Sequence, residues 1–305
     1  MGFTNSTQDG RSALTGMTLA LLAALFFSIK AIFVKLAYQY GVDAITLLTL
    51  RMSFALPVFM VVAIIEQRKA GVQPITRHQG MAMIGLGLIG YYLASMLDFV
   101  GLQYVSAGIE RLILFLFPTF TVLLSMLFLG RNVSRIEIGP LVLSYLGIAL
   151  AVQQEISLDG ENSLLGVLFI FGSTLAYAVY LIGSGELIPR IGSMRFMAFA
   201  MVVSCLAVIG QFIISRDITS LDQPLEVYGY GLAIALCSTV LPAFMLASAI
   251  HRIGASHTAI IGGIGPVATI VLAVIFLDES MSGLQIGGAV LAIAGVLLLG
   301  MFSRR

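Results

Sequence analysis

Long apolar stretches alternate with short polar ones from residue 14 almost to the end of the chain. A transmembrane helix needs roughly 20 consecutive apolar residues. Ten stretches approach that length: residues 14–38, 43–65, 78–101, 106–128, 136–152, 163–183, 194–215, 227–250, 257–277 and 284–301. They are too long for barrel strands and lack the alternation of lipid-facing and lumen-facing residues. The pattern therefore predicts an all-α integral membrane protein with ten transmembrane helices.

The second half of the chain repeats the first. A shift of 148 residues aligns residues 105–150 with residues 253–298 without a gap, and 14 of the 46 positions are identical. The matches include Pro118 with Pro266, which apolar bias alone produces less readily. Each unit holds five predicted helices, and an odd number makes the second unit enter the membrane from the opposite side. The sequence thus predicts two inverted five-helix repeats, the architecture of alternating-access transporters, whose substrate sites lie near the bilayer midplane.

The repeats and their flanks divide the chain into five parts. We expect a cytoplasmic N-terminal tail (1–13), a first repeat (14–152), an external linker (153–162), a second repeat (163–301) and a cytoplasmic tail (302–305). Lys and Arg are enriched in cytoplasmic segments of membrane proteins. With the N-terminus inside, eleven basic residues fall in cytoplasmic segments and only Arg216 falls outside. This predicts a multi-pass protein of the cell (inner) membrane with both termini in the cytoplasm.

Composition excludes other classes of protein. Hydrophobic residues make up 59% of the chain and charged residues 10%, with a mean hydropathy of +1.04, whereas soluble domains have about 25% charged residues. No basic run predicts nucleic-acid binding. No ATP-binding loop of the GxxxxGK type is present, so transport must draw on gradients. HExxH, GxGD and GxSG motifs are absent, and the three His and two Cys are scattered. We expect no enzyme, no catalytic residue, no cofactor and no metal site. A passive channel fits the paired prolines less well.

Ionisable residues interrupt the predicted helices of the first repeat and are almost absent from those of the second. An ionisable side chain within a helix costs about 2.5–3.5 kcal/mol on insertion scales, so it usually faces a cavity or a partner. The first repeat has Lys30, Lys35, Arg51, Asp98, Glu110 and Arg111. The second has Ala178, Phe199, Leu246, Thr258 and Ala259 at corresponding positions. We expect the charged end of a small substrate to meet the first repeat and its less polar part to meet the second.

Two interpretations of these charges stay open. Lys30 lies deep in its helix and is either an anion contact or titratable gate, or a structural partner of Asp98 or Glu110. Glu110 and Arg111 diverge by about 100° around their helix and cannot share a face, so we expect one to point inward and the other to pair sideways. Asp98, Glu110 and Arg111 are candidate substrate-binding residues, and Glu110 is the first candidate for proton uptake. Arg51 is expected to be a structural charge.

Four tyrosines near mid-membrane are further candidates for substrate contact. Tyr91 and Tyr92 lie in the third predicted helix, and Tyr177 and Tyr180, three residues apart, share a face of the sixth. Tyrosine offers a ring face and a hydroxyl donor to a small ligand. The alternative is ordinary helix packing.

Helix breaks stand at matching positions of the two repeats. Pro118 and Pro266 lie in mid-helix, and Gly262 and Gly265 precede Pro266. Proline removes a backbone hydrogen bond and kinks a helix. Paired breaks indicate the binding site in inverted-repeat transporters, so these four residues are predicted to act in gating. Static curvature is the alternative.

Residues 104–131, YVSAGIERLILFLFPTFTVLLSMLFLGR, combine a small-residue start, a central Pro and an end in which Phe-Leu is followed by Gly or an acid. Residues 252–279, RIGASHTAIIGGIGPVATIVLAVIFLDE, repeat this pattern. With Arg51 and its flank TLRMSFAL, the chain resembles the EamA family of the drug/metabolite transporter superfamily over residues 14–301. The chain departs from a symmetric pattern at Glu110-Arg111, where the second copy has Thr258-Ala259, and at Gly130-Arg131, where it has the family-like Asp278-Glu279.

The resemblance implies a ten-helix transporter with a central cavity lined mainly by helices 1, 3, 4, 6, 8 and 9. Family substrates include amino acids, other metabolites and organic phosphates, and many bacterial members are exporters. We therefore predict a secondary active transporter for a small polar metabolite, an amino acid or organic anion, that exports its substrate and couples to protons. Its partners are the substrate and the lipid bilayer, and both monomer and homodimer stay open. The alternative function is a multidrug exporter for lipophilic cations that uses Glu110.

Overall fold

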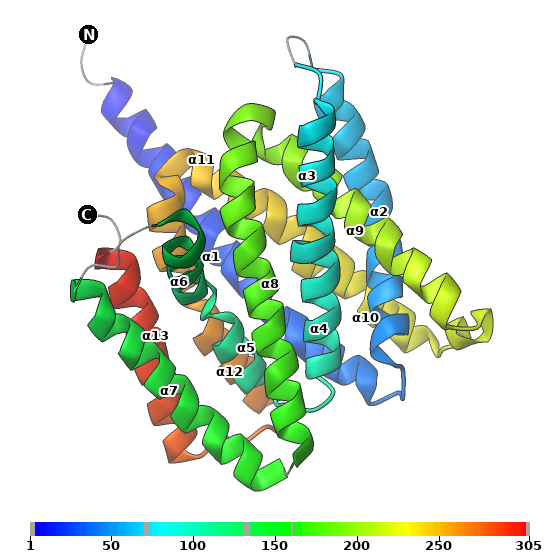
Figure 1. Cartoon of the computed structure of the whole chain (residues 1–305), viewed down its shortest axis with the longest axis vertical. Helices are drawn as coiled ribbons and strands as arrows, with labels where there is room; N and C mark the ends of the chain where they lie inside the picture. The colour runs from blue at the N-terminus through cyan, green and yellow to red at the C-terminus, as the bar shows by residue number, and fades with distance from the viewer. Residues whose placement is uncertain (1–3, 70–72, 131–134, 160, 303–305) are drawn as a thin grey trace.

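A computed structural model describes residues 4–69, 73–130, 135–159 and 161–302 of the 305-residue chain. Those residues form helices joined by short connections and contain no strand (Figure 1). Residues 1–3 and 303–305 of the predicted tails, and Arg131 among the predicted cytoplasmic basic residues, lie outside the described part. The predicted all-α architecture is confirmed.

The first repeat comprises α1 (Thr4–Tyr38), α2 (Ala44–Gln67), α3 (Arg77–Gly87), η1 (Leu88–Leu93), α4 (Ala94–Gly101), α5 (Ala107–Leu114), α6 (Phe117–Leu129) and α7 (Arg135–Asp159). The second comprises α8 (Glu161–Ile191), α9 (Ser193–Ser215), η2 (Ile218–Leu221), α10 (Leu225–Ala235), η3 (Leu236–Val240), α11 (Leu241–Gly262), α12 (Gly265–Leu277) and α13 (Gly283–Phe302). Nine helices of the described chain are long and apolar enough to cross a membrane, and Gly265–Leu277 is a shorter tenth. The ten predicted transmembrane helices correspond to these ten.

Backbone features recur at the predicted offset of 148 residues. α6 and α12 have the same length and begin at Phe117 and Gly265. Each ends in a left-handed residue, Gly130 and Asp278. The third and eighth transmembrane helices each contain a π-helical turn, η1 and η3, and both turns begin at equivalent leucines. The backbone conformation is therefore more similar between the two repeats than the side chains at equivalent positions are.

The turn predicted after residue 250 lies inside a segment that is helical throughout, Leu241–Gly262. The Tyr230 ring contacts the Phe33 and Tyr40 rings at a tilt toward the end of α1, and a Cβ on Gly16 toward its start would touch Ile253. Further along the chain, the carbonyl oxygen of Gly265 accepts a hydrogen bond from Ser28 in the middle of α1. The chain therefore runs antiparallel to α1 up to about Ile253 and parallel to it afterwards. The predicted reversal occurs, without a break in helical structure.

Helix also extends into the segments predicted as tail and linker. α1 begins at Thr4, although its apolar part begins only at Ala13. α7 continues to Asp159 and α8 begins at Glu161, so most of the predicted linker 153–162 is helical. The linker sequence contains only one helix breaker, Gly160, which explains why both helices continue beyond their apolar parts.

Close backbone packing joins α7 to α13 across the two repeats (Figure 1). A Cβ on Gly147 would lie 2.4 Å from the Ala292 backbone nitrogen and 2.5 Å from the Gly288 carbonyl oxygen. Its repeat equivalent, Gly295, packs equally closely on Ser144. Small residues permit such approach between membrane helices. Gly139, Gly283 and Gly287 are also candidates for this contact from their spacing, but a Cβ on any of them would meet no atom within 4 Å.

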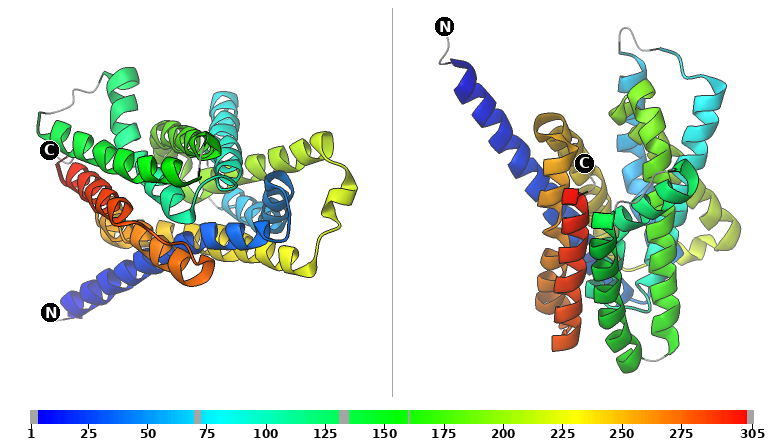
Figure 2. Two further views of the ribbon diagram at one scale, coloured as in Figure 1. Left: turned by 90° about the horizontal axis from the view of Figure 1, so that it is seen from below. Right: turned by 60° about the vertical axis from the view of Figure 1, so that its left-hand side comes forward.

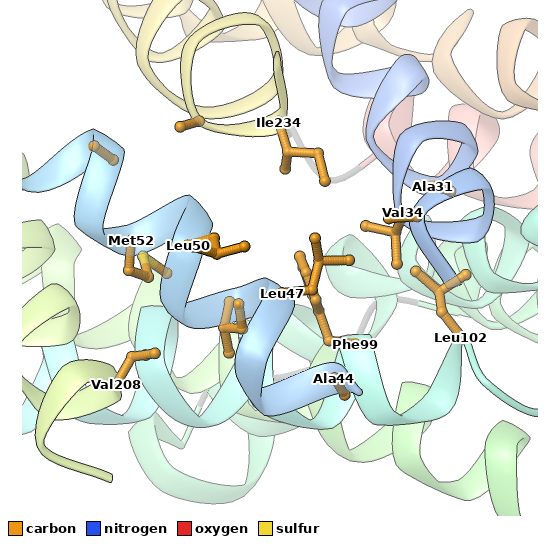
Figure 3. Close-up of a cluster of buried hydrophobic side chains, with 14 of the residues drawn as sticks. Ala31, Val34, Ala44, Leu47, Leu50, Met52, Phe99, Leu102, Val208 and Ile234 are labelled. Carbon is orange, nitrogen blue, oxygen red and sulfur yellow. The ribbon is translucent and has the colours of Figure 1, made fainter. Parts of the chain in front are cut away.

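The largest buried apolar cluster is formed by α1, α2, α4, α9 and α10 (Figure 3). Within it α2 and α9 are clamped at both ends. At one end Arg195 donates to the Gln67 side chain and the Gln73 carbonyl oxygen. At the other Arg216 lies 3.2 Å from Asp43, which caps α2. Partial burial alone raises the pKa of the Asp43 carboxyl, but hydrogen bonds from Thr46 and Arg216 outweigh this and hold that pKa below its usual value.

Glu279 ties the second repeat to the first. Its carboxylate oxygens accept hydrogen bonds from the backbone nitrogens of Ala107, at 3.0 Å, and Gly108, at 3.4 Å. These donors lie at the start of α5, where a carboxylate is favourable to the unpaired N–H groups and to the helix dipole. Both residues of the family-like Asp278-Glu279 pair thus have a structural role, because Asp278 ends α12 and Glu279 caps α5.

The α7–α13 contact predicts a matched pair of stability effects. Gly147→Ala places a methyl group against backbone atoms of α13, so it should lower the apparent Tm of the purified protein, with a cost of about 1–3 kcal/mol for overpacking. Gly139→Ala adds the same methyl group to open space on the same helix and should leave the Tm unchanged or slightly raised. Thermal unfolding in detergent would measure both. Equal effects of the two substitutions would contradict this contact.

Candidate functional site

Lys30 in the middle of α1 is surrounded by two carboxylates. Its Nζ lies 2.5 Å from Asp98 Oδ2 on α4 and 2.8 Å from Glu110 Oε1 on α5. The Lys30 side chain is 13% exposed, whereas those of Asp98 and Glu110 are 5% and 0% exposed. The sequence left Asp98 and Glu110 as alternative partners of Lys30, and in the structure both contact it.

The connection between α4 and α5 explains why both acids reach one lysine. Asp98 comes three residues before the end of α4, and Glu110 is the fourth residue of α5. A five-residue connection, 102–106, reverses the chain, and the Ser106 side chain caps α5 by accepting from Ile109 N. The reversal therefore brings both carboxylates to the same Nζ. Asp98 Oδ1 and Glu110 Oε2 are buried and lack a hydrogen-bond partner in the described chain.

Arg111 points away from Glu110, as their adjacent positions on α5 require. A Cβ on Gly265 would lie 2.8 Å from the Arg111 guanidinium nitrogen Nη2, so this side chain reaches the first residue of α12. Arg111 Nε is buried without a hydrogen-bond partner, and no carboxylate of the described residues forms an ion pair with it. The missing side chain of Gly265 makes room for this guanidinium.

A short polar contact joins α1 to α12 next to these charges. Ser28 Oγ donates to the carbonyl oxygen of Gly265 at 3.0 Å, and Thr269 Oγ1 donates to the Ser28 carbonyl oxygen at 3.3 Å. Ser28 is two residues from Lys30. The joint lies where α12 begins, so a movement of α12 would disturb Ser28, and with it the segment of α1 that carries Lys30.

The prolines predicted to act in gating occupy the first turns of new helices. Pro118 follows a break at 115–116 and lies in the first turn of α6, and Pro266 lies in that of α12 after a break at 263–264. This position suits proline, because the amide hydrogen that it lacks is unpaired there in any case. Gly262 is the last residue of α11 and has open space around it. Whether these breaks move stays a prediction.

Three of the four tyrosines form one aromatic group. Tyr91 and Tyr180 share a hydrogen bond, with their oxygens 3.1 Å apart. Tyr177 stacks on Tyr180, with ring centroids 5.8 Å apart. Gly90 allows this contact, because a Cβ there would lie 2.3 Å from Tyr180. Tyr91 and Tyr92 both pack against the large apolar cluster, but among the described residues Tyr92 has no ring contact or hydrogen bond with the other three tyrosines.

Arg51 contacts both repeats. Its Nε lies 2.9 Å from Thr239 Oγ1 in η3, and its Nη1 lies 3.4 Å from Ser95 Oγ in α4. Its guanidinium carbon lies 5.4 Å from the centre of the Phe99 ring. In the described chain no group of three His, Cys, Asp or Glu residues comes together that could hold a metal ion.

The chain matches the EamA-like transporter family model twice, over residues 14–153 and 164–301. The chain belongs to the EamA-like transporter family. It is 30% identical over 296 residues to the uncharacterized transporter YcbK of Bacillus subtilis, with 94% of each chain covered. It is 27% identical over 321 residues to the uncharacterized transporter sll1319 of Synechocystis, with 94% of this chain and 93% of the relative covered.

A solved crystal structure has the same fold as this EamA chain. It superposes with a TM-score of 0.64 over 97% of this chain and 99% of the other, at 16% sequence identity. The similarity at this identity concerns the fold alone. The comparisons establish a multi-pass membrane transporter built from two repeats, and the residues of the site come from this chain's own geometry.

The Lys30 cluster predicts a pH-dependent defect. Lys30→Met leaves two facing carboxylates buried without their cation, which should cost about 3–5 kcal/mol near neutral pH. Acidification should restore much of the lost Tm, because proton uptake removes the uncompensated charge. Thermal unfolding of the purified EamA protein between pH 5 and 8 would show this.

Lys69→Met is the matched control. Lys69 pairs with Glu66 at 2.6 Å, but its side chain is 55% exposed, so its loss should cost about 0–1 kcal/mol at any pH in that range. A pH-independent loss in Lys30→Met would show that the two carboxylates do not depend on Lys30 for their charge.

Proposed function

We propose that this EamA protein is a secondary active transporter that moves a small polar metabolite with an anionic group, an amino acid or organic anion, across the cytoplasmic membrane. It works by alternating access, exports its substrate and couples transport to protons. The substrate-binding residues are Lys30, Tyr91, Tyr92, Asp98, Glu110, Arg111, Tyr177 and Tyr180, and Pro118, Gly262, Gly265 and Pro266 act in gating. The membership of a transporter family supports transport in general, and the site supports the rest.

The observation that carries this proposal is the unmatched cation. Among the charges around the site, half-buried Lys30 and Arg111 and buried Arg51 are positive, and buried Asp98 and Glu110 are negative. Lys30 is held by both acids and Arg51 by two hydroxyls, whereas Arg111 has neither an ion pair nor a hydrogen bond in the described chain. An unpaired cation at membrane depth is costly. An anionic group of the substrate supplies the missing partner.

Proton coupling is supported by the two carboxylates. One lysine faces both Asp98 and Glu110, and each keeps an oxygen without a partner in the described chain. When Lys30 turns to an anionic substrate, both carboxylates lose their cation, and a buried carboxylate in that state takes up a proton. Substrate binding and proton binding are then linked through one side chain.

The orientation is supported by charge and by the path of the chain. α1 begins and α13 ends toward the same end of the bundle (Figure 2). The exposed Arg68, Lys69 and Arg77 lie at the α2–α3 connection, and Arg190 lies near the end of α8. The positive-inside rule places these basic segments in the cytoplasm. Both termini are then cytoplasmic, and the Lys30 cluster lies toward the external half of the membrane.

The multidrug alternative has less support. A pump for lipophilic cations needs a carboxylate that is free to pair with the drug. Glu110 is 0% exposed and lies 2.8 Å from Lys30, so a drug would have to displace a cation that is already bound to the protein.

A ligand screen by thermal shift tests the proposal. A ligand at 100 times its Kd stabilises the folded state by about 2.7 kcal/mol. Amino acids or organic acids should raise the Tm of the purified protein, and the shift should be lost in Arg111→Gln and weakened in Lys30→Ala. Arg216→Gln, which removes an arginine of an exposed ion pair away from the site, should keep the shift.

The same screen includes sugar phosphates and lipophilic cations. A shift with lipophilic cations alone, lost in Glu110→Gln and kept in Arg111→Gln, would replace the metabolite transporter by the multidrug exporter. Counterflow of the stabilising ligand in proteoliposomes separates a transporter from a passive channel, because only a saturable carrier exchanges labelled for unlabelled substrate.

A further inference from the structure

Two π-helical turns lie at equivalent positions of the two repeats. η1 spans Leu88–Leu93 and η3 spans Leu236–Val240. Both lie in the middle of a transmembrane helix, between α3 and α4 and between α10 and α11. A π-helical turn holds an extra residue relative to the α-helix and often lies at a functional site.

η1 precedes two residues that bind charged side chains, and η3 contains one. Asp98, which binds Lys30, lies five residues after η1, and Ser95 lies two residues after it. Thr239 belongs to η3, and its hydroxyl donates to the carbonyl oxygen of Ile234 five residues earlier, at 3.1 Å. Loss of the extra residue from such a turn would rotate the following helix by about 100° and shift it by about 1.5 Å. In α4 that rotation would carry Asp98 away from Lys30.

One side chain contacts both of these helices. Arg51 on α2 is 7% exposed. Its sequence neighbours Leu50 and Met52 belong to the large apolar cluster (Figure 3). Arg51 binds Thr239 in η3 at 2.9 Å and Ser95, just beyond η1, at 3.4 Å, while its guanidinium lies over Phe99 of α4. The planar guanidinium has several donors in fixed directions, so it can hold two acceptors at once.

We propose that Arg51 is a positioning residue that couples the two π-helical turns, so that the third and eighth transmembrane helices change conformation together. When either helix leaves its π-helical turn, its hydroxyl leaves Arg51, and the guanidinium loses one of the few polar contacts available to a buried charge. The other helix then loses the geometry that held it. This coupling would make the two inverted repeats move as one unit. Its consequence for transport rests on the proposed function, whereas the coupling itself does not.

Hydrogen exchange of the purified, ligand-free protein tests the coupling. Thr239→Val keeps the shape of the side chain and removes the acceptor in η3. Exchange should rise by roughly tenfold or more in residues 236–246, since a hydrogen bond to a charged group is lost. The decisive result is at the other repeat: exchange in residues 88–101, which Thr239 does not bind, should rise in the same experiment.

Reciprocity supplies the second arm, because coupling between two sites acts equally in both directions. Ser95→Ala should raise exchange in residues 236–246 as well as in 88–101. Arg51→Lys keeps the charge but not the fork of donors, and it should raise exchange in both segments. Thr49→Val is the matched control, because the Thr49 hydroxyl is buried on the same helix but donates to its own backbone, at Ile45 O. It should change neither segment.

Effects confined to the segment that carries each substitution would overturn the proposal and leave Arg51 as a static brace. Because no ligand is present, this outcome does not depend on which substrate the protein carries. A negative ligand screen combined with reciprocal exchange effects would refute the proposed substrate class and keep the coupling. If each substitution changed exchange only in its own segment, while a ligand bound in a way that depends on Arg111, the coupling would be refuted and the proposed substrate class kept.

Discussion

The structure depends on how it accommodates ionised side chains where water is scarce. Such a group must be met by opposite charge or by hydrogen bonds, or it costs several kcal/mol. Lys30 is met by two carboxylates and Arg51 by two hydroxyls and a ring face. These contacts join α1 to α4 and α5, and α2 to α4 and η3. Arg111 alone in this group has no direct hydrogen bond or ion pair in the described chain, although the charges of Glu110 and Asp98 are near enough to act on it. The site therefore has one cation without a directly bound partner.

The two repeats share a backbone and differ in chemistry. Equivalent left-handed residues, Gly130 and Asp278, end equivalent helices, and the π-helical turns begin at equivalent leucines. At equivalent positions within those turns, Tyr91 binds Tyr180 and Thr239 binds Arg51. The backbone geometry is preserved because lipid leaves few ways to satisfy peptide groups. Side chains that line the interior are free to diverge, and the charges gather in the first repeat.

The helices and the repeat can be predicted well from the sequence, because the lipid environment restricts the backbone to long apolar helices. Hydrocarbon demands long apolar helices, which are visible in composition, and Pro118 and Pro266 mark the broken helices because proline lacks an amide hydrogen. The π-helical turns have no such signature, since Tyr91 and Thr239 are compatible with an ordinary helix. Spacing cannot decide between Asp98 and Glu110 as partner of Lys30, because the connection 102–106 brings both within reach. The glycines before Pro266 suggest a hinge, but the contact of Gly265 with Arg111 is visible only in three dimensions.

Alternating access requires two states, and a ligand shifts their balance only if it binds them differently. In an inverted repeat with identical halves the two states would be related by symmetry and equal in energy. Here Lys30, Asp98 and Glu110 lie on one repeat, whereas Arg111 meets Gly265 of the other. Movement of α12 against α5 changes the surroundings of Arg111, and movement of α4 changes those of Lys30. In the proposed mechanism, an anion at Arg111 and a proton at the Lys30 cluster would therefore bind the two states unequally, which is the physical requirement for coupling substrate movement to a gradient.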